Sequence, residues 1–412
     1  KGEVMIMKEK ITVGLVGFGK RGKSLLKNIL IPMTSMDIEI KGVCDLYEDR
    51  ARFAADYVRD AIGIEPFCTT DYRDITSMDG LDAVIIMSAW ESHIPVALDA
   101  MKSGKYVGFE VGGGYSLDDC WKLVHVSEDT GMPCMLFENC CYGRREMMVL
   151  NMVKLGIFGD IMHCSGGYHH DLRREISTGE ENRHYRLRNY LNRNCENYPT
   201  HELGPIAQVL DINKGNRMIS LTSSSSRSQG LHDYIIANKG ADSPLAGVTF
   251  AQGDVVTTTI KCAKGQTIVL TLDTTLPRAY SRGFTVHGTK GMYAEDTDSI
   301  FIDGVHNSFD VKWKEQWGNA SQYEEEYDHP VWKEYKKQVV GGHEGMDWLV
   351  FRAFVESVKA GTQTPIDVYD TAALMCISAL SEESIACGSI PVPIPDFTNG
   401  RWMERHDSIQ SK

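Results

Sequence analysis

The sequence predicts an α/β fold in two parts. The first is an N-terminal Rossmann dinucleotide-binding domain, and the second is a C-terminal α+β domain with an open, mostly antiparallel sheet. Three observations predict this: strands and helices alternate through the first third, a glycine-rich turn follows the first strand, and the alternation stops near Glu138. We place the domains at residues 8–137 and 138–412, because 412 residues exceed one ordinary core.

The glycine-rich turn is the most informative motif of the chain. An apolar strand leads directly into Gly17-Phe18-Gly19-Lys20-Arg21-Gly22, and a helix-like segment follows. In such a G-x-G-x-x-G loop, Gly17 allows the tight turn, Gly19 lets the backbone approach a pyrophosphate, and Gly22 lets helix and strand pack closely. The helix N-terminus attracts phosphates. We expect Lys20 and Arg21 to flank the pyrophosphate.

The second strand specifies the nucleotide. It spans residues 38–44 and ends in Asp45, which lies 23 residues after Gly22. A carboxylate at this place accepts hydrogen bonds from the adenosine ribose, and its charge repels a 2′-phosphate. The sequence therefore predicts NAD rather than NADP, and the alternative is a glycine turn that binds no nucleotide.

The rest of the first part continues the alternation. We predict helices at 48–62, 94–103 and 117–130, and strands at 81–87, 106–110 and 133–137. Ligands of such folds bind beyond the carboxyl ends of the strands. Trp90, His93, Glu110 and Asn139 follow strands there, so we expect them to contact NAD.

In the second part of the chain, the predicted strands and helices no longer alternate regularly. We predict strands near 161–168, 218–224, 255–262, 267–272 and 284–287, and helices at 144–156, 346–360 and 369–387. A polar, aromatic-rich loop is expected over 312–342. The absence of repeats and of low-complexity linkers predicts that the two domains pack closely.

Composition excludes several classes of function. A net charge of −13 argues against nucleic acid or an anionic membrane as partner. No apolar run approaches the roughly 18 residues of a membrane span, and residues 1–10 lack the apolar core of a signal peptide. Eleven scattered cysteines indicate reduced thiols in the cytoplasm, although the vicinal pair Cys140-Cys141 leaves a redox site as a weaker alternative.

Several motifs together resemble the Gfo/Idh/MocA oxidoreductases, and within them glycoside hydrolase family 109, whose members include NAD-dependent α-N-acetylgalactosaminidases. The matching pieces are Gly104-Lys105-Tyr106-Val107-Gly108-Phe109-Glu110-Val111, Glu138-Asn139-Cys140-Cys141-Tyr142, Gly167-Tyr168-His169-His170-Asp171-Leu172-Arg173, Arg186-Leu187-Arg188 and Tyr198-Pro199-Thr200-His201-Glu202-Leu203-Gly204-Pro205. Two positions depart from the pattern. Val111 stands where sugar dehydrogenases of this fold carry a lysine, and Glu202 stands where family 109 usually has glycine.

The resemblance implies an oxidoreductive hydrolysis of a glycoside. Hydride leaves sugar C3 for tightly bound NAD, a base removes the C2 proton, the aglycone leaves C1, water adds, and the hydride returns. The resemblance places Tyr198 and His201 in catalysis and makes Tyr168 the C2 base. A histidine suits acid/base work near neutral pH.

The resemblance also supplies substrate-binding residues. We assign Glu138, His170 and Arg186 to the binding of a small carbohydrate substrate. We also expect positive charge from Arg173, Arg186 or Arg188 to acidify the Tyr168 phenol.

Each residue has a plainer alternative. Tyr168 would be a packed sheet aromatic, His201 a cap of a helix beginning near Gly204-Pro205, Glu138 a solvated loop acid, and Arg186 and Arg188 surface charges. The run His169-His170-Asp171 suggests a metal site, but adjacent strand residues point to opposite faces, so we expect no metal.

Two other functions compete with the glycosidase. One is an NAD-dependent sugar dehydrogenase or epimerase, which the missing lysine disfavours. The other is a nucleotide-binding regulator without turnover. The open face of the second sheet predicts a homodimer or homotetramer.

Overall fold

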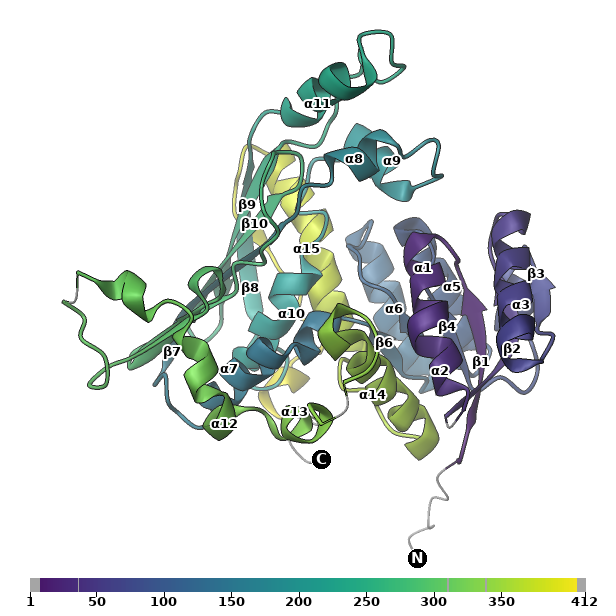
Figure 1. The fold of residues 1–412 in the computed structure, drawn as a ribbon, viewed down its shortest axis with the longest axis horizontal. Helices are drawn as coiled ribbons and strands as arrows, with labels where there is room; N and C mark the ends of the chain where they lie inside the picture. Colours follow the sequence, from purple (N-terminus) through teal and green to yellow (C-terminus); the bar gives the residue numbers. More distant parts are fainter. Residues whose placement is uncertain (1–7, 36, 310, 338, 406–412) are drawn as a thin grey trace, which may run out of the picture.

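The computed structural model describes residues 8–35, 37–309, 311–337 and 339–405. Two sheets organise the chain, with helices between and around them (Figure 1). The expectation for residues 1–10 falls largely outside the described residues, which begin at Lys8. Within the described ranges, no helix combines the length and apolarity that a membrane crossing requires.

The N-terminal sheet has six parallel strands in the order β3-β2-β1-β4-β5-β6. This is the strand order of a doubly wound dinucleotide-binding sheet, so the predicted Rossmann-type fold is confirmed. Its strands are β1 (Ile11–Val16), β2 (Ile38–Cys44), β3 (Phe67–Thr69), β4 (Ala83–Ile86), β5 (Tyr106–Phe109) and β6 (Cys134–Leu136). The central strand β4 is buried along its whole length, as expected of a sheet covered on both faces.

Helices cover this sheet on both faces. They are α1 (Lys20–Leu25), α2 (Ile31–Met33), α3 (Glu48–Ile62), α4 (Tyr72–Thr76), α5 (Trp90–Lys102) and α6 (Leu117–Thr130). A π-helical segment, Leu26–Leu30, joins α1 to α2, so the predicted helix is continuous, and it begins within the glycine-rich motif at Lys20. Helix α5 also starts four residues before the predicted Ile94, because Trp90 and its neighbours form a first turn in which Glu91 favours the helix dipole.

The C-terminal sheet has eight strands in the order β13-β12-β11-β7-β10-β9-β8-β14. Strands β7 and β10 pair in parallel and all other neighbours pair antiparallel, so the predicted mostly antiparallel sheet is confirmed. The strands are β7 (Ile161–His169), β8 (Met218–Ser225), β9 (Val255–Cys262), β10 (Thr267–Asp273), β11 (Thr285–Gly288), β12 (Gly291–Ala294), β13 (Ser299–Ile302) and β14 (Val392–Pro393).

Helices of the C-terminal part lie mainly between the two sheets (Figure 1). They are α7 (Arg144–Lys154), α8 (Arg173–Ser177), α9 (Tyr185–Asn192), α10 (Thr200–Val209), α11 (Gly230–Lys239), α12 (Glu324–Tyr327), α13 (Pro330–Tyr335), α14 (Met346–Ala360) and α15 (Val368–Ala386). Helix α15 packs against both α6 and β8, and α10 packs against β7. The two parts therefore share a continuous core, and the site lies between them.

The prediction of a loop over residues 312–342 is wrong in one respect, because much of this segment forms short helices. Short helices at Trp313–Gln316 and Asn319–Tyr323 precede α12 and α13. Tertiary contacts hold these turns: Arg144 forms an ion pair with Asp328 at 2.7 Å, and the buried Trp332 donates a hydrogen bond to the Tyr142 carbonyl at 2.9 Å. Such short helices have little propensity signal of their own.

Candidate active site

The glycine loop is shaped for a phosphate. Gly17 has a φ of +100°, and a Cβ there would lie 2.4 Å from the Ser88 nitrogen. A Cβ on Gly22 would lie 2.1 Å from the Gly17 carbonyl, so both positions require glycine. A Cβ added to Gly19 would have only the Arg50 guanidinium nearby, at 3.8 Å, so the space where α1 begins is open. The loop thus has the tight turn and the open approach that a dinucleotide requires.

Asp45 lies at the carboxyl end of β2, beneath this loop. Its Oδ2 accepts a hydrogen bond from the Phe18 N–H at 2.6 Å, and its Oδ1 accepts one from the Tyr47 N–H at 2.9 Å. A carboxylate has about four lone-pair sites, so capacity for ribose hydroxyls remains. The backbone bonds fix the carboxylate before any ligand arrives.

Arg21 joins the loop to distant parts of the chain. Its guanidinium pairs with Glu110 at 3.2 Å and with Asp347 at 2.8 Å, and Asn139 donates to the same Asp347 carboxylate at 2.8 Å. Burial alone would raise the pKa of Asp347, but hydrogen bonds from Arg21 and His343 hold it well below its usual range. Sequence reasoning missed Asp347 because it lies in a helix with no motif. Lys20, by contrast, is mostly exposed and lies 3.8 Å from Glu175.

Trp90 and His93 line the next strand end. The indole packs over Gly112, where a Cβ would lie 2.5 Å from the ring. His93 Nε2 contacts the Ser88 carbonyl at 3.0 Å, and burial lowers the His93 pKa to about 4. The imidazole is therefore neutral at physiological pH, which suits a neighbour of a cofactor.

His201 and Glu138 form the central polar pair. His201 Nδ1 lies 2.7 Å from Glu138 Oε1, and its Nε2 lies 3.3 Å from the Tyr198 hydroxyl. The Glu138 side chain is 0% exposed, so the alternative of a solvated loop acid is wrong. Burial would raise the pKa of Glu138, but the charge and hydrogen bond of His201 keep it below its ordinary value.

The backbone explains how this pair forms. Helix α10 begins at Thr200, not near Gly204-Pro205, so His201 lies in its first turn. Pro205 has no N–H to donate, which suggested a helix start, but the turns before it form because α10 packs on the β7 strand. Gly204 lets the helix approach Glu138: a Cβ there would lie 2.6 Å from Glu138 Cγ.

An aromatic cluster faces the pair. The Tyr168 and Tyr198 rings lie 4.2 Å apart, and the Tyr168 hydroxyl lies 2.9 Å from His170 Nδ1. The Tyr280 ring lies 5.1 Å from the His170 ring, and sequence reasoning missed it because it sits in an irregular segment after β10. His169 is on the other side, where a Cβ on Gly167 would meet its ring. The alternating placement of His169 and His170 agrees with the strand periodicity.

Arg186 supplies the cation of the cluster. Its guanidinium lies 4.9 Å from the Tyr198 ring, 5.1 Å from the Trp90 ring and 5.9 Å from the Tyr168 ring. The side chain is 8% exposed, so the alternative of a surface charge is wrong. Burial raises the pKa of Tyr168 above its ordinary value, and the Arg186 charge opposes this rise.

The other two candidate arginines bind elsewhere. Arg173 pairs with Asp171 at 2.7 Å, and Arg188 pairs with Glu91. Arg188 is half-exposed, in agreement with its plainer alternative of a surface charge.

Two further carboxyls lie under the site. Glu202 is buried against Gly166. A Cβ added to Gly166 would lie 2.8 Å from the Cβ of Glu202. Burial, followed by the charges of Glu196 and Glu138, raises the pKa of Glu202 well above its ordinary value. Burial also raises the pKa of Glu196 to about 8. Sequence reasoning noticed Glu202 and missed Glu196.

Helix α15 anchors the segment that carries Tyr198. The Ser378 hydroxyl donates to the Glu196 carbonyl at 2.7 Å, and the Glu196 N–H donates to the Ser381 hydroxyl at 2.8 Å.

Several buried polar atoms of the site have no hydrogen-bond partner within the described chain, which points to a ligand. Among the described residues, Trp90 Nε1, His93 Nδ1, Glu138 Oε2 and Arg186 Nη1 are buried without a hydrogen-bond partner. Buried polar groups usually have one, so these atoms fit a site built for NAD and a polyhydroxylated substrate.

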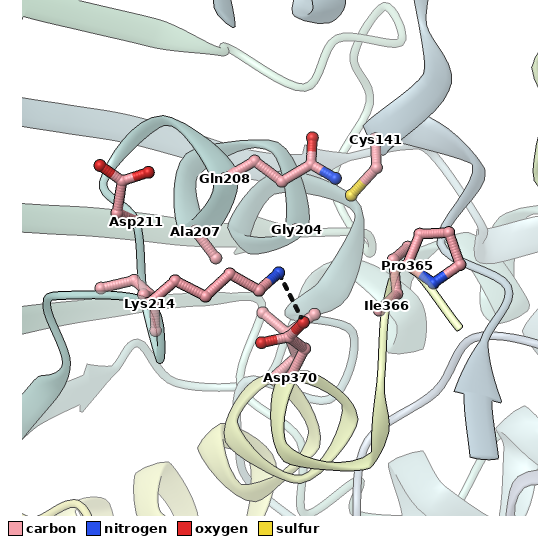
Figure 2. Close-up of a pocket in the computed structure, with 11 residues that line it drawn as sticks. Cys141, Gly204, Ala207, Gln208, Asp211, Lys214, Pro365, Ile366 and Asp370 are labelled. Carbon is pink, nitrogen blue, oxygen red and sulfur yellow. Dashed lines mark hydrogen bonds and ion pairs between the residues drawn. The ribbon is translucent and has the colours of Figure 1, made fainter. Parts of the chain in front are cut away.

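A separate hollow lies on another side of α10 (Figure 2). It is lined by Cys141, Gly204, Ala207, Gln208, Asp211, Ile212, Lys214, Pro365, Ile366, Asp370 and Leu374. Lys214 and Asp370 form an ion pair at 3.1 Å across it. None of the predicted site residues lines this hollow, so it is distinct from the aromatic cluster.

Family comparisons agree with this geometry. Residues 11–137 match the model of the oxidoreductase family with an NAD-binding Rossmann fold, and residues 142–404 match the C-terminal domain of glycosyl hydrolase 109. A glycosyl hydrolase family 109 protein of Stenotrophomonas maltophilia is 38% identical, covering 96% of this chain and 91% of that protein. An alpha-N-acetylgalactosaminidase of Tannerella forsythia is 36% identical, covering 96% and 88%.

Solved structures share the fold. Levoglucosan dehydrogenase in complex with NADH aligns with a TM-score of 0.69 at 16% identity, covering 94% of this chain and all (100%) of that one. An inositol dehydrogenase homologue from Azotobacter vinelandii, complexed with NADH and myo-inositol, aligns with a TM-score of 0.65 at 15% identity, covering 94% and 98%. At such identities the likeness shows the fold alone.

Proposed function

Because this chain belongs to glycosyl hydrolase family 109 and is an NAD-dependent glycosidase, we propose that it hydrolyses N-acetylgalactosaminides or related glycosides. One observation carries the proposal: Tyr168, on strand β7, meets Tyr198 and His201, at the start of helix α10, beside buried polar atoms that lack partners. The named activity of the Tannerella forsythia relative supports the choice of sugar.

The first sheet would hold the cofactor. Gly17, Gly19 and Gly22 would receive the pyrophosphate, Asp45 the ribose, and Trp90 and His93 the nicotinamide side. Bound NAD supplies a hydride acceptor and donor for sugar C3, which lets the neighbouring C2 proton become acidic. Arg21, Glu110 and Asn139 meet around Asp347, and through this network they would fix the edge of the cofactor site.

The aromatic cluster would remove the C2 proton. In this role the Tyr168 oxygen takes the proton, after passing its own proton to His170 Nδ1, 2.9 Å away. Arg186 favours the phenolate because its charge lies near the ring. Elimination of the aglycone from C1 then needs no pair of carboxylates at a fixed separation.

His201 and Tyr198 would move the proton of the C3 hydroxyl. Tyr198 and His201 Nε2 share a contact, so a proton taken from the sugar passes between them. We predicted that Glu138 holds sugar hydroxyls. Its Oε1 is already engaged by His201 and by the Cys140 N–H at 3.1 Å, so we propose that Glu138 positions His201 and that only Oε2 reaches substrate.

A deuterium experiment tests the cycle. Purified enzyme is given α- and β-nitrophenyl glycosides in D₂O, and the released sugar is analysed by NMR. We expect coloured product, no net NADH, and deuterium at C2. Tyr168→Phe should lose cleavage and label together while NAD stays bound.

Other outcomes would identify a different enzyme. Cleavage without label at C2 would mean direct displacement and would refute the cycle. Accumulation of NADH would indicate the dehydrogenase or epimerase, which Val111 at the usual lysine position disfavours. Neither colour nor NADH would indicate a regulator.

We also propose a homodimer or homotetramer in the cytoplasm. The face of the second sheet turned away from α10 and α15 carries none of the helices labelled in Figure 1. All eleven cysteines are free, which fits a reducing compartment. Light scattering coupled to gel filtration measures the assembly, and a monomer would contradict it.

A further inference from the structure

Three potential metal ligands, one of them His201, converge at the start of helix α10. One ligand atom each from Glu138, Cys140 and His201 lies within 4.8 Å of the other two. Glu138 and Cys140 are buried, and the His201 side chain is 14% exposed. We propose that this cluster binds a thiophilic divalent cation such as Zn²⁺, and that the bound cation inhibits the enzyme. The inhibition rests on the proposed function, whereas the binding does not.

The donor set fits such a cation. Thiolate sulfur, imidazole nitrogen and carboxylate oxygen are the ligands that Zn²⁺ takes, at about 2.0–2.3 Å. Ligand atoms of a tetrahedral site at those lengths lie about 3.3–3.8 Å apart. Ligand atoms at the 4.8 Å limit would approach by roughly an ångström, whereas His201 Nδ1 and Glu138 Oε1, 2.7 Å apart, would separate to admit the cation. Three protein ligands leave a fourth position for water or a sugar oxygen.

The surroundings already orient the ligands. Glu138 Oε1 accepts from the Cys140 N–H, and His201 Nε2 lies 3.3 Å from the Tyr198 hydroxyl. A metal bound to His201 Nδ1 would keep that outer contact, which is how metal-bound histidines are usually held. The cation would replace the proton between His201 and Glu138, and that pair would no longer exchange protons with the sugar.

The charge around the cluster is balanced. Arg282 lies beside the Cys140 thiol and pairs with Glu146 at 2.5 Å. Burial raises the pKa of the Cys140 thiol well above its ordinary value, and the charge and hydrogen bond of Arg282 oppose this rise. With Glu138 and a Cys140 thiolate, the divalent cation meets two negative charges, while Arg282 and Glu146 offset each other.

The neighbouring cysteine is a matched control. Cys141 is as buried as Cys140, at 3% against 2% exposed, but it lines the separate hollow of Figure 2, where its sulfur points toward α10. It is not part of the three-ligand cluster. The sequence drew attention to His169-His170-Asp171 instead, but Asp171 pairs with Arg173.

The experiment compares the NAD-loaded enzyme with Cys140→Ser and Cys141→Ser. After chelator treatment, each is titrated with Cd²⁺ while the sulfur-to-cadmium charge-transfer band is recorded, and with Zn²⁺ while glycoside cleavage is measured. Cys68 and Cys387 are exposed in all three proteins, so the difference between variants reports Cys140. We expect one additional cadmium per chain in the wild type and Cys141→Ser, absent in Cys140→Ser.

Inhibition should follow the same pattern. Zn²⁺ should inhibit the wild type and Cys141→Ser at least tenfold more strongly than Cys140→Ser, and chelator should restore the rate. Equal cadmium bands in Cys140→Ser and wild type would overturn the site. If Cys140→Ser does not fold, protection of wild-type Cys140 from alkylation by Zn²⁺ decides instead, and no protection refutes the proposal. A protein that binds Cd²⁺ at Cys140 but cleaves no glycoside would refute the proposed function alone.

Discussion

Glu138 shows what a single residue gains from its tertiary setting. Glu138 follows β6, which predicts a position at the ligand edge of the sheet. Its hydrogen bond to His201 depends on two further features: α10 begins at Thr200, and Gly204 has no side chain to clash with Glu138. Residues after strands, such as Trp90, His93 and Asn139, were predictable because parallel strands end at one edge. Asp347, Tyr280 and Arg282 were not, because they come from segments without a motif.

Glu138→Gln should lower kcat by about 10²-fold, because a neutral amide no longer balances the charge on His201. The measurement is steady-state cleavage of a nitrophenyl glycoside, with NAD content after denaturation as the control. NAD content should not change, since Glu138 contacts none of the glycine loop. A wild-type kcat would show that Glu138 does not position the histidine.

Glu196 should make stability depend on pH. Burial raises the folded-state pKa of Glu196 to about 8, whereas the unfolded value is about 4.3. Between these values the folded state holds a proton that the unfolded state has lost, so stability is lost as pH rises. The slope is at most about 1.4 kcal/mol per pH unit.

Glu196→Gln should remove this slope, because an amide resembles the neutral acid in shape and does not titrate. Urea unfolding at pH 5 and pH 8 measures it: the wild type should lose more free energy of unfolding over this interval than the variant. Equal losses would mean that Glu196 titrates normally in the folded chain.

At the scale of elements, helix caps decided which boundaries were predictable. Helices α3, α6 and α14 have the predicted bounds because glycines with positive φ, Gly63, Gly131 and Gly361, end them. Strands β12 and β13 have four residues each and were not predicted, since so short a run carries little periodicity. They form because β12 pairs with β11, and β13 pairs with β12.

The segment with α8 and α9 contacts two helices that follow strand ends of the first sheet, α3 and α5. Arg183 pairs with Asp49 at 2.7 Å, Arg50 donates to the Asn182 carbonyl at 2.7 Å, and Arg188 pairs with Glu91. Asp49, Arg50 and Glu91 all follow strand ends of the first sheet. The segment therefore bridges the two parts of the chain across the place where NAD would lie.

Arg183→Ala should speed NAD dissociation about two- to fivefold, the effect of losing one exposed ion pair. Added salt should speed release from the wild type and change the variant less, because salt screens exposed charges. Stopped-flow release of NADH, followed by its fluorescence, measures both. Lys214→Ala, at the distant hollow, is the control; identical release from Arg183→Ala and wild type would show that the segment does not retain NAD.

At the scale of the whole molecule, α15 binds the two parts together. It is buried on nearly all sides and packs against α6 of the first part and β8 of the second. The Arg21–Asp347 pair adds a polar link between the same parts. The family models meet near residues 137–142, yet no unstructured linker separates them in the described chain.

We therefore expect one cooperative unfolding transition despite the length of the chain. Differential scanning calorimetry should give a single peak with equal calorimetric and van't Hoff enthalpies, and NAD should shift the whole peak upward. Two peaks, with only one moved by NAD, would show that the parts unfold independently.

The pairing of Glu138 with His201 has a consequence for how such an enzyme changes during evolution. Glu138 lies at the junction of the two family matches, and its partner arrives with the C-terminal one. Exchange of the C-terminal half between homologous genes would bring a new sugar pocket together with its own histidine. The hybrid would work at once only if the donor's histidine met a glutamate at the junction. Laboratory recombination should therefore cross over before residue 138, so that both partners are inherited together.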